Sequence, residues 1–197
     1  MGKRCNWVRT NADADYHDTE WGRPSHDERY LFEMLILEGA QAGLSWSTIL
    51  KKRKGYRAAF ANFTVDEVAR FTSNQLEKLL LDPGIVRHRG KIESVVTNAL
   101  AVQQIRATHG SLAAFLWSFV DGRPRLNDWD SYRDAPPAST EISDALSRAL
   151  KRYGCKFVGS TICYALMQAI GMVNDHEFGC PCREDCVKLG AARAVVA

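Results

Sequence analysis

The sequence predicts an all-α fold, and three observations lead to this prediction. After residue 26, apolar residues recur at helical spacing in one segment after another. Ser or Thr stands before many of these segments and Gly or Pro follows them, as is typical of helix caps. No segment sustains the alternation of apolar and polar residues that a half-buried strand requires.

Residues 1–26 are the exception, because they are polar and aromatic and show neither helical nor strand periodicity. Three bulky rings and a Cys/His pair stand in this segment: Trp7, Tyr16, Trp21, Cys5 and His17. We therefore expect an irregular segment that something other than secondary structure holds in place.

A buried helix is predicted from Ser25 to Glu38. Ser25-x-x-Glu28 has the form of a capping box, and the apolar face that follows is too wide for a surface helix. Between the acid that ends this helix and the ring of Trp46 lie small residues, namely Gly39, Ala40, Ala42 and Gly43.

Glu38 can be interpreted in two ways. A buried carboxylate is costly unless it has a partner. An acid, open space and an aromatic wall together suit a pocket for a planar ring that is cationic or carries an amine. The plain alternative is that Glu38 is an exposed residue in the last turn of its helix.

Seven further helices are expected, over residues 45–55, 64–71, 73–81, 89–108, 112–120, 142–153 and 160–170. Ser45 and Ser111 stand at N-cap positions, and Thr64 begins a second capping box. Gly154 and Gly171 follow the last two helices, where a left-handed C-terminal residue favours glycine.

Composition places the chain among ordinary globular proteins. Of its 197 residues, 46% are hydrophobic and 25% charged, with a net charge of +3 that points to no particular partner. No apolar run is long enough to span a membrane, and the N-terminus lacks the apolar core of a signal peptide. We expect a cytoplasmic protein without a membrane partner. Its six cysteines then favour metal binding or free thiols over disulfides.

Cys and His residues gather near both ends of the chain. Cys5 and His17 lie near one end, and His176 and Cys180 lie near the other with the spacing H-x3-C. Two Cys and two His form a closed tetrahedral set that is typical of structural zinc. Such a site would order the aperiodic N-terminal segment and tie the two ends together. Alternatives remain open, because the neighbouring Cys182 and Cys186 offer the same ligand and unpaired thiols are also possible.

Two basic segments are candidates for contact with nucleic acid. Asp82-Pro83-Gly84-Ile85 separates two predicted helices and is followed by the cations Arg87, Arg89 and Lys91. Backbone N–H groups in such a hairpin, together with a helix N-terminus, can hold a phosphate. Residues 51–57 carry five cations, but a solvated helix end is the better interpretation there.

Several motifs, taken in order, resemble the bacterial DNA-3-methyladenine glycosylases of type I. They are CNWV, YHDTEWG, FEMLILEGAQAGLSW, DPGIVRHRGKI, FLWSFV and KFVGSTICYALMQAIGMVNDH, and they extend with the final cysteine from Cys5 to Cys180. The resemblance implies a helix-hairpin-helix glycosylase fold, with residues 1–186 forming one helical domain of two lobes and the base pocket between them. Residues 187–197 fall outside it and are expected to be a mobile tail.

The resemblance also implies which residues form the sites. Its structural zinc, one ion per chain, falls on Cys5, His17, His176 and Cys180, and this selects Cys180 over its neighbours. Its base pocket falls on Glu38 as the catalytic residue and on the rings Tyr16, Trp46, Trp21 and Trp7. Two features depart from the wider superfamily. Val86 stands where the hairpin usually has a second glycine, and no catalytic aspartate belongs to the family pattern.

The function implied is flipping and hydrolytic excision of N3-methyladenine from alkylated duplex DNA by a monomer, with release of the free base and an abasic site. Because N3-methylation makes the base cationic, the base is already a good leaving group. We expect Glu38 to accept hydrogen bonds from its edge and Tyr16 and Trp46 to hold its two faces. The expected DNA contacts are Gly43 and Leu44 in the gap left by the flipped base, and Gly84, Ile85, Arg87, Arg89 and Lys91 at the backbone.

Three other functions compete with this one. A zinc-stabilised DNA-binding module without activity would explain the hairpin and the metal ligands, but not Glu38 beside an aromatic wall. A glycosylase for mismatched or oxidised bases would need the aspartate, or a lysine nucleophile, that is not evident here. A zinc hydrolase would keep one coordination position open, whereas two Cys and two His occupy all four.

Overall fold

The computed structural model describes residues 3–127 and 136–194. The helices are α1 (Asn11–Thr19), α2 (Glu28–Gln41), α3 (Trp46–Ala59), α4 (Val65–Val68), α5 (Ser73–Leu79), α6 (Arg89–His109), α7 (Leu112–Trp117), α8 (Glu141–Arg152), α9 (Ser160–Ala169) and α10 (Pro181–Ala194). Two short 3-10 turns lie at Ala61–Phe63 and Ser118–Val120. The prediction of a mainly helical protein is confirmed. The strands are β1 (Arg125–Leu126) and β2 (Val173–Asn174), which pair in parallel.

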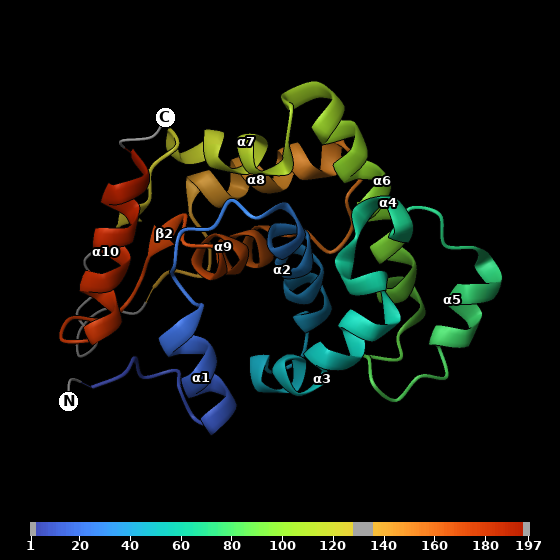
Figure 1. Cartoon of the computed structure of the whole chain (residues 1–197), viewed down its shortest axis with the longest axis horizontal. Helices are drawn as coiled ribbons and strands as arrows, with labels where there is room; N and C mark the ends of the chain where they lie inside the picture. Colours follow the sequence, from blue (N-terminus) through green and yellow to red (C-terminus); the bar gives the residue numbers. More distant parts are fainter. Residues whose placement is uncertain (1–2, 128–135, 195–197) are drawn as a thin grey trace.

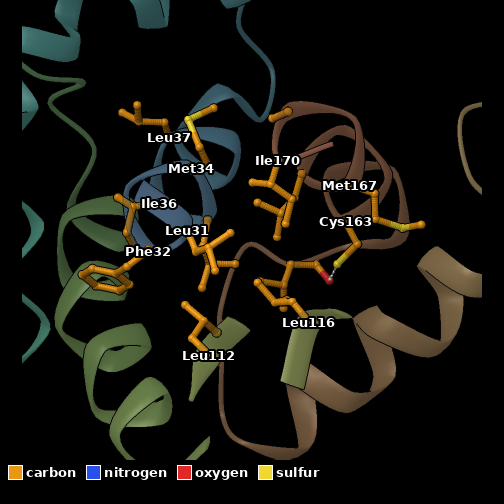
Figure 2. Packing of buried hydrophobic residues seen from close by; sticks show 14 of the residues in the cluster. Leu31, Phe32, Met34, Ile36, Leu37, Leu112, Leu116, Cys163, Met167 and Ile170 are labelled. Atoms are coloured by element: carbon orange, nitrogen blue, oxygen red, sulfur yellow. Dashed lines mark hydrogen bonds between the residues drawn. The ribbon is translucent and has the colours of Figure 1, made fainter. Parts of the chain in front are cut away.

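Helix α2 lies at the centre of the fold, in contact with α3, α6, α7 and α9 (Figure 1). Every residue from Leu31 to Ala40 is buried, because the helix has neighbours on every side and Glu33 and Glu38 are the only charged residues of this stretch. Figure 2 shows side chains of α2 facing Leu112 and Leu116 on one side and Ile170 on another. The acid at the end of α2 is thereby carried into the interior.

Helix α1 corrects the expectation that residues 1–26 are irregular. Thr10 caps it, and Asp13 completes a capping box by accepting from the Thr10 N–H. Its buried face consists of Asp13, Tyr16 and His17 rather than aliphatic residues. The hydrophobic period that predicts a helix is therefore missing, although capping and packing still form one.

Several predicted helix ends shift. Asp27, not Ser25, is the N-cap of α2, since its carboxylate accepts from the Tyr30 N–H at 2.7 Å. Helix α3 continues past its predicted end at Gly55, because that glycine serves packing rather than termination. A Cβ on Gly55 would lie 2.2 Å from the carbonyl oxygen of Gly84, so only a glycine lets α3 meet the hairpin after α5.

Residues 187–194 of the expected tail are helical, and the expectation that the tail is mobile stays a prediction. Helix α10 starts at Pro181 and continues to Ala194, with Cys182 and Cys186 buried on its inner side. Helix α10 and the N-terminal segment lie on the same side of the molecule (Figure 1). Among the described residues, no helix is long and apolar enough to cross a membrane.

Candidate functional site

All five predicted base-pocket residues line a single cavity of about 430 Å³. Tyr16 comes from α1, Glu38 from the last turns of α2 and Trp46 from the start of α3, while Trp7 and Trp21 flank α1. The other lining residues are Cys5, Asn6, Gln41, Pro136, Ala165, Gln168, Asp175 and Glu177. The cavity thus lies between α1, α2 and α3 on one side and α9 with the segment after β2 on the other.

Glu38 is buried, which settles the choice between the two interpretations of this residue. Its side chain is 4% exposed, and its Oε2 atom has no hydrogen-bond partner within the described chain. Burial raises the pKa of the carboxyl to about 8. An unpartnered buried carboxylate is costly. A ligand that donates a hydrogen bond to Oε2 would therefore supply a partner that the described chain lacks.

Three unpartnered donors share the cavity with Glu38. They are the indole N–H groups of Trp7 and Trp46 and the hydroxyl of Tyr16, all buried and without a partner within the described chain. Burial raises the pKa of Tyr16 well above its usual value, so that its hydroxyl remains a proton donor. Buried polar groups almost always find partners in proteins. Four unsatisfied groups around one cavity therefore indicate a binding site.

The aromatic rings form a continuous wall rather than a clamp. The ring centroids of Tyr16 and Trp46 are 5.2 Å apart, and those of Trp7 and Trp21 are 5.1 Å apart. A base held between two parallel rings would need about 7 Å, twice a contact distance of about 3.5 Å. The expectation that Tyr16 and Trp46 hold opposite faces of a base is therefore wrong for this conformation, in which the two rings touch each other.

The four predicted metal ligands come together at one point. Cys5, His17, His176 and Cys180 are buried, and their ligand atoms all lie within 4.8 Å of one another. The Cys180 sulfur is 3.5 Å from His17 Nε2 and from His176 Nδ1, and the Cys5 sulfur is 3.6 Å from the same His176 atom. A tetrahedral zinc site with ordinary bond lengths has S–N edges of about 3.6 Å. The three S–N distances therefore match those of a tetrahedral zinc site.

The second nitrogen of each histidine also has a partner, as expected at a metal site. His17 Nδ1 lies 2.8 Å from the Asp18 carboxylate, and His176 Nε2 lies 3.1 Å from the Trp21 carbonyl oxygen. Hydrogen bonds from Cys5 and from both histidines hold the pKa of Cys180 far below its usual range, which favours the thiolate that a metal requires.

The metal-ligand cluster and the cavity share a wall. The Trp21 ring lies 4.6 Å from that of His176, and Cys5 belongs both to the cluster and to the cavity lining. Tyr16 immediately precedes His17 in α1. A displacement of the four metal ligands would therefore also displace side chains that line the cavity.

The hairpin between α5 and α6 differs in detail from its prediction. Gly84 has no positive φ, and a Cβ there would lie 2.9 Å from Asp82 Oδ1. The N–H of Gly84 donates to that oxygen and the N–H of Ile85 to the Asp82 carbonyl. Ile85 itself is buried. The hairpin N–H groups expected to bind phosphate are therefore already partly used.

Of the three predicted phosphate-binding cations, only Arg87 is exposed and has no hydrogen bond or ion pair in the structure that we describe. Arg89 is exposed but paired, with its Nη2 atom 2.9 Å from Glu77 Oε2. Lys91 is buried, and its ammonium group donates to the carbonyl oxygens of Ala40 and Ala42, so its prediction as a DNA contact is wrong.

Gly43 and Leu44 form the turn between α2 and α3, between the cavity-lining residues Gln41 and Trp46 in the sequence. Gly43 has φ +75°, which favours glycine, although a Cβ there would meet no other atom. Leu44 is 41% exposed. The structure therefore presents an apolar side chain at the end of the helix that carries Glu38.

Comparison with known proteins now identifies the family. A family model for methyladenine glycosylases matches residues 7–184. The DNA-3-methyladenine glycosylase 1 of Escherichia coli strain K12 is 49% identical over 181 residues, which cover 91% of this chain and 96% of that protein. The DNA-3-methyladenine glycosylase of Haemophilus influenzae is 45% identical over 184 residues, covering 93% of this chain and 99% of that one.

The chain belongs to the methyladenine glycosylase family. Its fold also matches a solved structure, that of a variant of 3-methyladenine DNA glycosylase I in complex with 3-methyladenine. The TM-score is 0.89 at 35% identity, over 93% of this chain and 98% of that one.

In this methyladenine glycosylase, polar contacts that sequence reasoning missed hold the pocket helices together. Arg53 of α3 donates to Glu33 of α2 at 2.7 Å and, through both terminal nitrogens, to Glu20 after α1 at 2.8 Å. The carboxylate of Asp13 accepts from the Ser47 hydroxyl at 2.9 Å, which fixes the start of α3 to α1. The role of Arg53 could not be recognised from the sequence, because Arg53 lies within the basic run of α3 and the sequence does not distinguish a solvated cation from a buried one.

Asp175 is a second carboxylate of the cavity that the sequence did not single out. It is buried and accepts hydrogen bonds from Tyr164 at 2.7 Å, Gln168 at 2.8 Å and Asn127 at 2.6 Å. Glu38 and Asp175 thus stand in the same cavity in opposite situations, one without a partner on Oε2 and one with three donors.

The raised pKa of Glu38 makes a prediction for stability. The folded protein binds this proton up to about pH 8, whereas an unfolded glutamate loses it near pH 4.5. Between these values the folded state holds more protons, so its stability should fall as pH rises. Relative to Glu38→Gln, we expect the free energy of unfolding in urea to fall by about 3 kcal/mol between pH 5 and pH 8.

Every other group titrates alike in the two proteins, so the difference between their free energies of unfolding reports on Glu38 alone. Parallel curves for wild type and Glu38→Gln would contradict the prediction and would mean that the carboxylate is solvated or paired in the folded protein.

Proposed function

We propose that this chain is a DNA repair glycosylase that extrudes N3-methyladenine from alkylated duplex DNA and excises it hydrolytically, leaving an abasic site. The observation that carries the proposal is the set of unpartnered polar groups around the cavity, three donors and one acceptor. Family membership and the match to a structure holding 3-methyladenine support the same conclusion.

The hydrogen-bonding groups of the base complement this set. Released 3-methyladenine has ring nitrogens at N1, N7 and N9 that accept hydrogen bonds and one exocyclic amine that donates. Trp7, Tyr16 and Trp46 offer donors, and Glu38 offers the acceptor. The aromatic wall adds a surface on which one face of the base can stack, a contact worth about 1–3 kcal/mol per base.

Charge favours the methylated base over a normal one. N3-methylation places a positive charge on the ring while the base is still attached to the sugar. A cation beside Glu38 favours the ionised carboxylate, which burial alone disfavours. A normal base carries no positive charge, so it does not offset the cost of ionising Glu38 inside the cavity.

The reaction itself needs little help from the protein. As the glycosidic bond breaks, its electron pair moves to N9 and neutralises the cationic ring. Water then adds to C1′ of the sugar and releases one proton, which gives the abasic site. The protein contributes binding and orientation of the extruded base, and the carboxylate of Glu38 is the group we place against it.

We further propose that Cys5, His17, His176 and Cys180 hold one structural zinc ion. When bound, the ion would supply no chemistry to the reaction, since the four ligands leave no open position for water. What the ligands do is fix α1 against the C-terminal segment, and with it the positions of Tyr16 and Trp21 in the pocket.

We assign DNA binding to the helix-hairpin-helix formed by α5, α6 and the hairpin between them. The N-terminus of α6 with Arg87 suits a phosphate, and Arg89 is close enough in sequence to add a second contact. Leu44 would fill the gap left by the extruded base, on the turn that Gly43 permits. The enzyme would act as a monomer in the cytoplasm.

Release of free base from methylated duplex DNA tests the proposed function. Wild type should release 3-methyladenine and leave 7-methylguanine, as resolved by chromatography. Glu38→Gln should reduce the rate about 10- to 100-fold, because the amide cannot balance the charge of the base. The exposed Glu67→Gln, which loses the same charge elsewhere, should keep the wild-type rate.

No release by folded wild-type protein would refute the glycosylase and leave a DNA-binding module. Equal rates for wild type and Glu38→Gln would remove Glu38 from the reaction.

Metal analysis tests the cluster. Purified wild type should contain one zinc ion per chain, and Cys180→Ser should lose it together with thermal stability. Cys186→Ser is the matched control, because Cys186 is equally buried on α10 but is not one of the four proposed ligands. A Cys180→Ser protein with full zinc content and unchanged stability would refute the ligand assignment.

A further inference from the structure

Lys91 is a buried lysine with an unusual pair of partners. It is 9% exposed, and its ammonium group donates to the carbonyl oxygens of Ala40 at 2.9 Å and Ala42 at 2.6 Å. These carbonyls belong to the C-terminus of α2, where the last carbonyl groups of a helix lack partners and a cation is favourable. Lys91 is therefore an external cap of α2.

The capped carbonyls lie at the base of the turn that presents Leu44. Ala42 is the C-cap of α2, Gly43 follows with its left-handed φ, and the N–H of Leu44 closes the turn on the Gln41 carbonyl at 2.6 Å. The ammonium group of Lys91 thus determines where this turn leaves the helix.

The other end of Lys91 belongs to the first turn of α6. Its backbone N–H donates to Nδ1 of the N-cap His88 at 3.2 Å, directly after the hairpin. One side chain therefore joins the α6 N-terminus to the Leu44 turn. These are the two segments that the proposed function places against DNA.

We propose that Lys91 is a positioning residue for base extrusion. It holds the turn of residues 41–44 at a fixed place relative to the α6 N-terminus, so that Leu44 meets the duplex where the phosphate contacts have placed it. The proposal rests on the proposed function. Lys91 itself touches neither base nor phosphate, and its effect passes through Leu44.

A double-mutant cycle tests this mechanism directly. Binding to a duplex with one abasic-site analogue would be measured by fluorescence anisotropy for wild type, Lys91→Met, Leu44→Ala and the double variant. Lys91→Met should weaken binding about tenfold in the wild-type background, because the turn loses its anchor. In the Leu44→Ala background the same change should cost less than about threefold. Lys188→Met, which removes an exposed lysine of α10, is the control for lost charge and should bind as wild type does.

Affinity for free 3-methyladenine distinguishes positioning from general stabilisation, because a variant that only loosens the fold would also bind the free base more weakly. Tyr16, Glu38 and Trp46 lie outside the turn of residues 41–44, so in Lys91→Met binding of the free base should stay within about twofold of wild type. Lys91→Arg keeps a cation near both carbonyls and should restore most of the duplex affinity. If Lys91→Met does not fold, Lys91→Gln, which keeps an amide donor, takes its place and should show a smaller loss with the same dependence on Leu44.

Effects that multiply in the double variant would overturn the proposal, as would equal losses of duplex and free-base binding. Either result leaves the proposed function intact if wild type still releases 3-methyladenine. Failure of wild type to release or bind the base is a failure of the proposed function instead.

Discussion

The ion pairs of Arg53 are the interaction on which the pocket depends. Helix α1 carries Tyr16 but has no aliphatic face to attach it to the core. Arg53 joins the end of α1 to α2 and α3 through Glu20 and Glu33, and Asp13 adds a second link to α3 at Ser47. Burial alone would raise the pKa of Asp13, but the hydrogen bonds from Ser47 and Thr10 outweigh it and hold the pKa below its usual value. These polar contacts keep three helices together without filling the space between them.

Within α2, residues that stabilise the fold stand directly beside a residue that serves the pocket. Between Leu31 and Leu37, α2 buries apolar side chains and one paired acid, Glu33, whereas Glu38, one residue further on, is a buried acid with an unpartnered oxygen. Unsatisfied buried groups cost stability, and the apolar surface that α2 buries compensates for them. Binding sites are where such local conflicts are expected, because the ligand supplies the missing partner.

Sequence reasoning recovered the parts of the molecule that depend on pattern. The helices with apolar periodicity, such as α6 and α8, were predicted closely, and the dispersed residues Glu38, Tyr16 and Trp46 do line one cavity. Helix α1 and α10 were missed because their inner faces are polar or rich in cysteine. Lys91 was misassigned because a buried cap and a phosphate-binding lysine have the same spacing after a hairpin. Asp175 and Arg53 could not be singled out, since their importance comes from partners distant in sequence.

Binding of the free base tests the central claim, that the cavity complements 3-methyladenine, most directly. Trp7, Trp21 and Trp46 line the cavity, so their fluorescence reports on its occupant. Titration with 3-methyladenine should give a saturable change at one site, while adenine, whose N9 carries a hydrogen and offers no acceptor there, should bind at least tenfold more weakly by the loss of one matched hydrogen bond, about 1.4 kcal/mol. Equal binding of the two bases, or no saturable change with either, would contradict the account.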